Sequence, residues 1–150
     1  MSSNAGPVVL KWVDVGSELH KLELALRFRI LRAPLNLPPG SEVHAAEKDI
    51  WHLVALQNGQ VVGCVLLLPD AARRSGQLLQ MAVDDSLQGQ GLGRKLVLEL
   101  EARVVREGFS KIILHAREVA SIFYAKLGYL PQGDLFEEVG IPHQVMTKDL

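Results

Sequence analysis

The chain has 150 residues, of which 48% are hydrophobic and 22% charged, and its formal net charge at pH 7 is -1. These values are ordinary for a globular protein, and the length suits a single domain spanning residues 1–150. The near-zero net charge leaves no electrostatic footprint for nucleic acid or for an anionic membrane surface, so we expect neither as a partner.

The cysteine content and the apolar runs bear on the compartment. Cys64 is the one cysteine in the sequence, so no internal disulfide can form and a reducing compartment is the simpler expectation. No apolar run approaches the roughly 20 residues of a membrane-spanning helix. The first ten residues lack the basic start and long apolar core of a signal peptide. We therefore expect a cytoplasmic protein.

The N-terminal third predicts a strand, a helix and a loop. An apolar stretch at residues 8–15 is typical of a first strand, and Ser17 can cap a helix that runs to about Leu31. The apolar face of this helix is expected at Leu19, Leu22, Leu26 and Ile30. Pro34 to Lys48 is too rich in proline and polar residues to be core, so we expect a loop there.

A β-hairpin is the clearest local signal that follows. Residues 50–56 are apolar on both faces, as in an interior strand. Asn58 and Gly59 form the favoured pair for a two-residue hairpin turn. The chain then returns as a second strand from Val61 to Leu68.

The segment from Leu78 to Gly93 organises the rest of the chain. An apolar run, Leu78 to Val83, predicts a strand; a polar bend follows, and then a glycine-rich loop opens into a helix near Leu92 that Gly108 ends. A strand over 111–116, a helix over 118–127, and strands near 135–139 and 143–148 complete the prediction. We expect an α/β (α+β) fold with a mixed sheet of about six to seven strands and helices on both faces.

The glycine loop predicts a site for a phosphate-bearing ligand. The first N–H groups of a helix have no partner inside it and carry partial positive charge. Three alternating glycines, Gly89, Gly91 and Gly93, let an anion approach these amides closely. A Walker loop is excluded because Arg94 follows the last glycine, and the G-x-G-x-G spacing differs from that of a dinucleotide fingerprint.

Four segments carry a resemblance to a known family, and the resemblance is specific from about Ile50 to the C-terminus. They are Q-x-x-G-x-G at Gln88, Gly91 and Gly93; QMAV at 80–83; ASIFYAKLGY at 120–129; and GIPHQVMTK at 140–148. The first resembles the coenzyme A pyrophosphate loop of the GNAT superfamily of N-acetyltransferases, and the next two are similar to its pantetheine-side strand and its A-x-x-F-Y-x-x-x-G-F/Y helix. The last looks like the ending of the small bacterial ElaA-like branch.

The resemblance implies the GNAT fold and acetyl-CoA, or coenzyme A, as co-substrate. It makes Tyr124 the candidate acid that protonates the departing thiolate, and it implies that distortion of the strand matching residues 80–83 leaves N–H donors for the oxyanion. The coenzyme-binding residues that it implies are Met81, Ala82, Val83, Gln88, Gly89, Gln90, Gly91, Leu92, Gly93, Arg94, Arg117 and Tyr124. A core aromatic and a purely structural glycine turn are the alternatives for Tyr124 and the loop.

One position departs from the family pattern. Many members have asparagine three residues before the alanine that matches Ala120, whereas this chain has Arg117. The coenzyme contact made by that asparagine is therefore in doubt. An arginine could instead meet a phosphate or an acidic substrate group, or stand as a surface cation at a helix start.

The general base and the substrate contacts are less defined. His115, at the end of a strand expected to splay from residues 80–83, is our catalytic candidate for the base. His52 and Gln80 are candidates for substrate contact, although a lone histidine on an apolar face is more often a hydrogen-bonded core residue. His143 could face the acceptor pocket or fix the closing hairpin, and we favour the hairpin. Glu42 and Glu47 could bind a cationic substrate, but a solvated face is the usual role of such residues.

We therefore expect an N-acetyltransferase in which a primary amine attacks acetyl-CoA directly in a ternary complex. An acyl-enzyme is disfavoured because Cys64 lies in an expected buried strand, and no residue spacing suggests a metal site. The alternatives are a non-catalytic acyl-CoA-binding sensor and an acyl donor longer than acetyl. The acceptor, a small-molecule amine or a protein lysine, is left open, as is a homodimer formed through the C-terminal segment.

Overall fold

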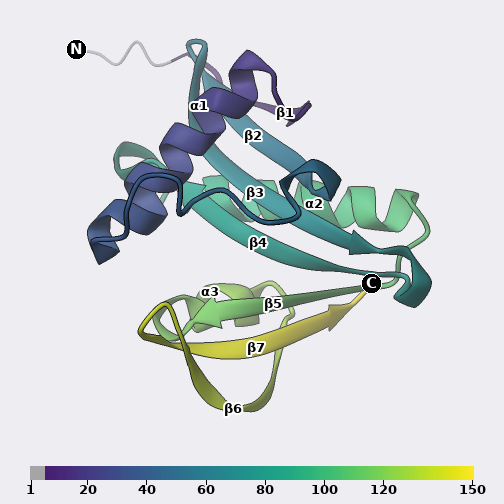
Figure 1. Cartoon of the computed structure of the whole chain (residues 1–150). Helices are drawn as coiled ribbons and strands as arrows, with labels where there is room; N and C mark the ends of the chain where they lie inside the picture. Colours follow the sequence, from purple (N-terminus) through teal and green to yellow (C-terminus); the bar gives the residue numbers. More distant parts are fainter. Residues whose placement is uncertain (1–5) are drawn as a thin grey trace.

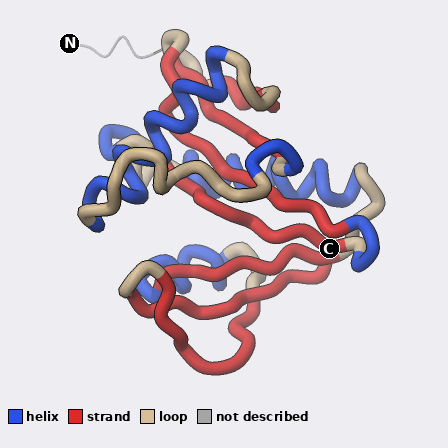
Figure 2. The backbone as a smooth tube through the Cα atoms, viewed as in Figure 1, coloured by secondary structure: helices blue, strands red, loops and turns tan. Residues whose placement is uncertain are grey.

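A computed structural model describes residues 6–150, and its strands form one seven-stranded sheet in the order β1-β2-β3-β4-β5-β7-β6 (Figures 1 and 2). The strands are β1 (Val9–Val13), β2 (Trp51–Gln57), β3 (Gln60–Asp70), β4 (Ser75–Val83), β5 (Lys111–Arg117), β6 (Leu130–Glu138) and β7 (Ile141–Asp149). The helices are α1 (Glu18–Arg27), α2 (Leu92–Arg106) and α3 (Ser121–Lys126). The expected mixed sheet with helices on both faces is confirmed.

The two short hairpin turns in this sheet, between β2 and β3 and between β6 and β7, each use two consecutive residues with positive φ. Asn58 and Gly59 (φ 53° and 77°) join β2 to β3 as expected, because a turn with two such residues matches the twist of the strands. Val139 and Gly140 (φ 47° and 76°) join β6 to β7 in the same way. The closing hairpin is longer than the sequence predicts, since β6 begins at Leu130.

The sheet opens between β4 and β5. These two strands are parallel and pair only from Ser75 to Leu78 against Lys111 to Leu114. Beyond these residues the strands diverge, and Figure 1 shows β5, β7 and β6 turning away from β2, β3 and β4. The edge of β4 that follows Leu78 therefore has no strand partner on the β5 side.

The helices cover the two faces of the sheet and produce two apolar cores. α2 and α3 pack against one face, where Leu96, Leu100 and Tyr124 join residues such as Leu114 of β5. α1 packs against the other face, where Leu26 joins a smaller cluster with Cys64. None of the helices within residues 6–150 is long and apolar enough to cross a membrane.

The buried face of α1 differs from the prediction. Ser17 caps the helix as expected, because its hydroxyl accepts a hydrogen bond from the His20 amide at 3.2 Å. The residues that are buried, however, are His20, Glu23, Leu26 and Arg27. Leu22, which the apolar spacing places inside, is 45% exposed. Polar partners from other segments, described below, stabilise the charged residues inside and rotate the helix away from its leucine stripe.

Candidate functional site

The glycine loop and the first turn of α2 leave a row of main-chain amides open. Gly89 and Gly91 have φ values of 79° and 83°, and space surrounds each where a Cβ would stand. Gly91 is the N-cap residue and provides no side-chain cap. The first helical hydrogen bond recorded here runs from the Lys95 amide to the Gly91 carbonyl at 3.1 Å. The preceding amides, up to that of Arg94, are therefore available to an anion.

The third glycine brings this loop against α3. A Cβ on Gly93 would stand 3.3 Å from Phe123 Cζ and 3.4 Å from Met81 Cε, so a side chain here would crowd both neighbours. The absence of a side chain at Gly93 thus lets the end of β4, the start of α2 and α3 meet at one point. The structure brings the expected coenzyme strand and loop together beside the helix that carries Tyr124.

Tyr124 lies in this region with its hydroxyl unengaged. The side chain is 6% exposed and packs edge-on against Phe123 and Tyr129, with ring centroids 5.0 and 5.8 Å away. Within residues 6–150 its hydroxyl has no recorded hydrogen-bond partner, whereas that of Tyr129 donates to Glu101 Oε2 at 2.8 Å. Burial raises the pKa of Tyr124 above its ordinary value of 10.0, so the hydroxyl keeps its proton.

A β-bulge interrupts β4 where the sheet opens. Cys64 pairs with Ala82 and Leu66 with Leu79, so Gln80 and Met81 stand opposite the single residue Val65. Gln80 has φ 43°, which is unusual for a residue with a side chain. The local distortion that the sequence resemblance implies is present, and it lies in the part of β4 beyond Leu78 that pairs with β3 but not with β5.

The Gln80 side chain is held from the α1 side. Its Oε1 accepts a hydrogen bond from Arg27 Nε at 2.8 Å, and its Nε2 donates to the Glu42 carbonyl at 3.1 Å. Arg27 Nη2 donates to the same carbonyl. The candidate substrate residue Gln80 is therefore engaged on both ends of its amide, so its side chain positions the bulge and the Glu42 segment relative to one another.

Arg27 itself is the centre of a buried charge network. The side chain is fully buried, and Nη1 donates to Glu23 Oε2 at 2.8 Å and to Glu47 Oε2 at 2.6 Å. His52 Nδ1 lies 2.7 Å from Glu23 Oε2, and His20 Nε2 lies 2.8 Å from Glu47 Oε2. Among the described residues, Glu23 Oε1 is the one fully buried side-chain oxygen or nitrogen without a partner.

The hydrogen bonds assign the charge of His52. Its Nε2 lies 3.1 Å from the Glu47 carbonyl, which only accepts, and its Nδ1 faces the Glu23 carboxylate. Both nitrogens therefore donate, as in an imidazolium. Burial alone would lower the pKa of His52, but the hydrogen bond and charge of Glu23 outweigh it and raise that pKa. His20 accepts a hydrogen bond from the Gly16 amide through Nδ1, which leaves its Nε2 to donate to Glu47.

This geometry leaves His52 unable to contact an acceptor substrate. It is 1% exposed and both ring nitrogens are engaged inside the network, so the role of a hydrogen-bonded core residue describes it and substrate contact does not. Glu47 is likewise buried rather than solvated, at 8% exposure. Arg27 and His52 balance the two carboxylates, so the network carries no net charge.

The same cluster contains a set of groups that could coordinate a metal. One ligand atom from each of His20, Glu23, Glu47 and His52 lies within 4.8 Å of the others. The sequence spacing shows no such set, because the four residues come from α1, the loop and β2. Arg27 already provides the positive charge between the two carboxylates, and a metal ion would have to displace it.

His115 lies on the face of β5 opposite Tyr124. Its Nδ1 is 2.9 Å from Glu138 Oε1, and its side chain is 31% exposed. A carboxylate in this position orients the imidazole and leaves Nε2 to face a substrate. His143 Nδ1 donates to the Ile141 carbonyl at 2.9 Å and its ring is buried, so it fixes the closing hairpin, the role that we favoured.

Arg117, the last residue of β5, extends from the same face as His115 because side chains alternate along a strand. Its Nη2 donates to the Leu31 carbonyl at 3.2 Å, in the π-helical turn Phe28–Arg32 that follows α1. The side chain therefore spans the opening of the sheet toward α1, away from the glycine loop at the start of α2.

The sequence candidates thus form two groups. The glycine loop, Met81 and Tyr124 gather on the α2 side, whereas Gln80, His115 and Arg117 lie on the α1 side. Sequence reasoning missed the residues that support the second group: His20, Glu23, Arg27, Arg32 and Glu138. The i,i+4 spacing of Glu23 and Arg27 was the available signal, but such a pair usually lies on an exposed helix face.

Comparisons with known proteins show the family and the fold of this chain. A family model for an acetyltransferase (GNAT) domain matches residues 40–150. A putative acetyltransferase of Bacillus subtilis is 34% identical over 100 residues, which cover 67% of each chain. The crystal structure of Escherichia coli ElaA has a TM-score of 0.83 at 19% identity, covering 95% of this chain and 99% of that one. An aminoglycoside 6'-N-acetyltransferase complexed with coenzyme A has a TM-score of 0.77 at 19% identity, covering 94% and 96%.

The fold and the family match together define an acyltransferase enzyme. The chain belongs to the GNAT family of acetyltransferases.

Proposed function

We propose that this protein transfers an acetyl group from acetyl-CoA directly to a primary amine within a ternary complex. The observation that carries the proposal is the open row of amides at the start of α2, next to a buried tyrosine whose hydroxyl has no hydrogen-bond partner among residues 6–150. The acceptor is a small-molecule amine or a protein lysine.

The glycine loop fits the diphosphate of coenzyme A. It combines unpartnered main-chain N–H groups, a helix dipole, and the cations Arg94 and Lys95 in the first turn of a helix with no acidic residue there. Gln88 to Arg94 would bind the diphosphate, and Met81 to Val83 would lie beside the pantetheine arm. When bound, the coenzyme provides the activated acetyl thioester; the other groups needed for transfer belong to the chain.

Acetyl transfer needs two proton transfers, and the two side chains proposed for them lie on opposite sides of β5. A lysine-like amine has a pKa near 10.4, so freeing it at pH 7 costs about 4.6 kcal/mol, and a base is useful. His115, oriented by Glu138, is the proposed base. Tyr124 is the proposed acid for the departing thiolate. Cys64 is fully buried, which supports direct attack by the amine over an acyl-enzyme.

The test is a pair of measurements on the purified protein. Calorimetric titration with coenzyme A should give a measurable Kd, and thiol release from acetyl-CoA should rise when a broad panel of primary amines is added. Coenzyme binding with slow hydrolysis that no amine stimulates would instead favour an acyl-CoA sensor. No affinity for coenzyme A would remove the proposal.

A further inference from the structure

Two arginine side chains converge at the end of the opened sheet. The Leu31 carbonyl accepts a hydrogen bond from Arg117 Nη2 at 3.2 Å, and Arg32 Nη1 lies 3.5 Å from the same oxygen. Arg32 is held further by a hydrogen bond from its Nε to the Ser41 carbonyl at 3.2 Å. The Leu31 carbonyl oxygen thus brings together two guanidinium groups from segments far apart in the chain.

Neither guanidinium forms an ion pair with the part of the chain that the structure describes. Within residues 6–150, no carboxylate lies within 4.0 Å of either one, whereas the buried Arg27 and the half-buried Arg103 both have such partners. Arg32 and Arg117 are themselves half-buried. Nη2 of Arg32 and Nε and Nη1 of Arg117 have no recorded acceptor among the described residues, so donors remain for a ligand.

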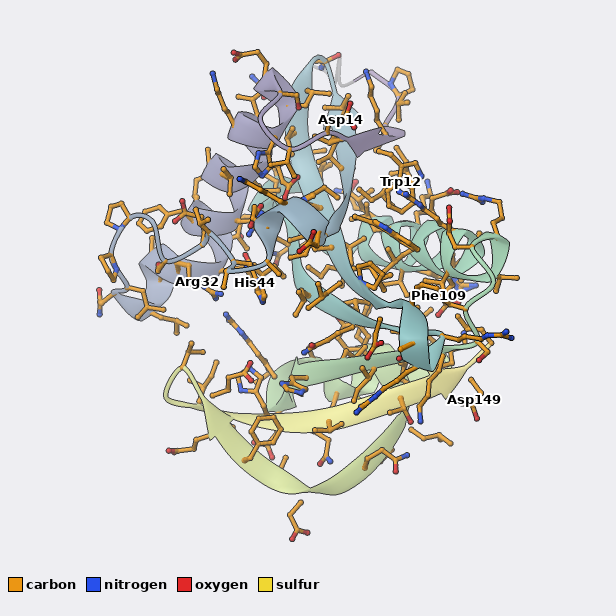
Figure 3. The ribbon with its side chains drawn as sticks, turned by 45° about the vertical axis from the view of Figure 1, so that its right-hand side comes forward. Trp12, Asp14, Arg32, His44, Phe109 and Asp149 are labelled. Atoms are coloured by element: carbon orange, nitrogen blue, oxygen red, sulfur yellow. The ribbon has the colours of Figure 1, made fainter. Side chains whose placement is uncertain are left out.

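The surroundings of the pair are electrostatically positive. Burial and the charges of Arg117 and Arg27 lower the pKa of Arg32, and the charges of Glu138 and Glu42 compensate only in part. Two cations held close in a half-buried place gain from an anion between them, and guanidinium groups match carboxylates and phosphates geometrically. Figure 3 places Arg32 in the segment between α1 and the hairpin of β6 and β7.

The pair lies beside the proposed base. His115 and Arg117 extend from the same face of β5 two residues apart, a separation of about 6.6 Å along a strand. Glu138, which binds His115, is also among the charged groups that act on Arg32. An acceptor that spans this interval would present its amine at His115 and an anionic group at the arginines.

We propose that Arg32 and Arg117 form an anion subsite for the acceptor, so that the substrate is a short amine bearing a carboxylate or a phosphate. This inference rests on the proposed acetyl transfer and names the substrate class for that same site. It also assigns Arg117 to the acceptor instead of the coenzyme.

Pairs of amines that differ in the presence of an anionic group provide the test. β-Alanine is compared with its amide, and O-phosphoethanolamine with ethanolamine, by kcat/KM for thiol release at saturating acetyl-CoA. In at least one pair, we expect kcat/KM for the anionic amine to exceed that for the neutral amine by ~10-fold or more, the effect of one or two charge-assisted hydrogen bonds. Which pair shows the larger ratio identifies the anion as carboxylate or phosphate.

Variants assign the preference to the two arginines. Arg32→Gln and Arg117→Gln should each reduce that ratio about tenfold through KM, with the Kd for coenzyme A unchanged. Arg106→Gln, which alters an exposed arginine on α2, should leave both quantities unchanged. Circular dichroism confirms that each variant is folded.

The outcomes separate this inference from the proposed function. Equal or faster acetylation of the neutral amines, no anionic amine acetylated by a protein that binds coenzyme A, or an unchanged ratio in both variants would overturn the anion subsite alone. Loss of coenzyme affinity in Arg117→Gln would return that residue to the coenzyme. A wild-type protein with no affinity for coenzyme A would overturn the proposed function as well.

Discussion

At the scale of single residues, Tyr124 and Tyr129 allow a catalytic effect to be distinguished from an effect on stability, because the Tyr129 hydroxyl has a hydrogen-bond partner and the Tyr124 hydroxyl has none within residues 6–150. Tyr124→Phe should lower kcat by about ten- to a hundredfold while the Kd for coenzyme A stays nearly unchanged, because the change removes only a proton donor. Stability should hardly change, since the hydroxyl has no recorded partner within residues 6–150. Steady-state kinetics and calorimetry measure the two quantities, and unaltered turnover would remove Tyr124 from the mechanism.

Tyr129→Phe is the matched control. Its hydroxyl donates to Glu101 Oε2 at 2.8 Å, and Lys148 Nζ lies 3.0 Å from Glu101 Oε1. Removing the hydroxyl leaves a buried carboxylate with one donor fewer, which should cost about 1–3 kcal/mol of unfolding free energy. We expect kcat to be retained. The pair of variants thus predicts opposite effects from the same chemical change on neighbouring rings.

The proposed role of His115 as the base depends on its carboxylate partner. Glu138→Gln removes the charge that orients the imidazole, so we expect kcat to fall by roughly tenfold with a change in the pH–rate profile. Glu137→Gln is the control, because Glu137 is exposed and makes no recorded contact with a histidine. An identical pH–rate profile for Glu138→Gln and the wild-type protein would argue that the base lies elsewhere.

At the scale of elements, the glycine loop offers a substitution with a close internal match. Gly91 and Gly108, at the two ends of α2, have φ values of 83° and 85°, and nothing lies within 4 Å of a Cβ at either position. Replacing either by glutamate should cost a similar amount, about 1–2 kcal/mol, for the left-handed backbone. Only Gly91→Glu should abolish coenzyme A binding, because it adds charge and bulk beside the open amides.

Calorimetric titration of the two variants reports this difference. Melting temperatures recorded beside it should fall no further for Gly91→Glu than for Gly108→Glu, whose added charge lies at the disfavoured C-terminal end of the helix, and this removes general destabilisation as the cause. If Gly91→Glu still binds coenzyme A as the wild-type protein does, the loop does not hold the diphosphate.

Elements whose signals are local could be predicted from the sequence. The turn at Asn58 and Gly59 needs two positive φ values, which that dipeptide adopts readily. The glycine loop likewise predicts where α2 begins. Arg27 could not be placed in this way. Its partners come from α1, the loop before β2 and the bulge of β4, and only the folded sheet brings them within hydrogen-bonding distance.

The same limit explains the face of α1 and the position of the site. A leucine stripe predicts the buried face when the partner surface is apolar, but here the partner surface carries Glu47 and His52. The opening between β4 and β5 is a property of pairing between distant segments, which no local pattern encodes. Arg32 and Arg117 meet only because of it.

At the scale of the whole molecule, the network around Arg27 joins the segments on the α1 side of the sheet. It connects α1, the loop containing Glu42, β2 and the bulge of β4 through hydrogen bonds of ionised groups. Such buried ion pairs contribute little net stability while intact. Breaking one leaves an unpaired charge in the interior, which is strongly destabilising. The free energy of unfolding should therefore decrease at both ends of the pH range in which Glu47 and His52 are both ionised.

Glu47 sets the acid limit of this range and His52 sets the alkaline limit. Burial opposes ionisation of Glu47, but hydrogen bonds from Arg27 and His20 outweigh it and lower its pKa from 4.5 to about 2. The stability that this carboxylate provides is complete above its unfolded pKa and is lost as pH falls toward 2. For His52 the folded pKa is raised above 6.5, so its contribution is complete below that value and is lost as pH rises through the folded pKa.

Urea unfolding from pH 2 to 10 should therefore give a plateau between about pH 4.5 and 6.5 with a decline on either side. His52→Asn should lower the plateau and flatten the alkaline decline, because asparagine can donate to the Glu47 carbonyl but carries no titrating charge. Glu18→Gln, which removes an exposed ion pair with Lys21, should leave the whole profile unchanged. An alkaline limb equally steep in the wild-type and His52→Asn proteins would show that His52 is not charged in the fold, and the charge balance around Arg27 would have to be drawn differently.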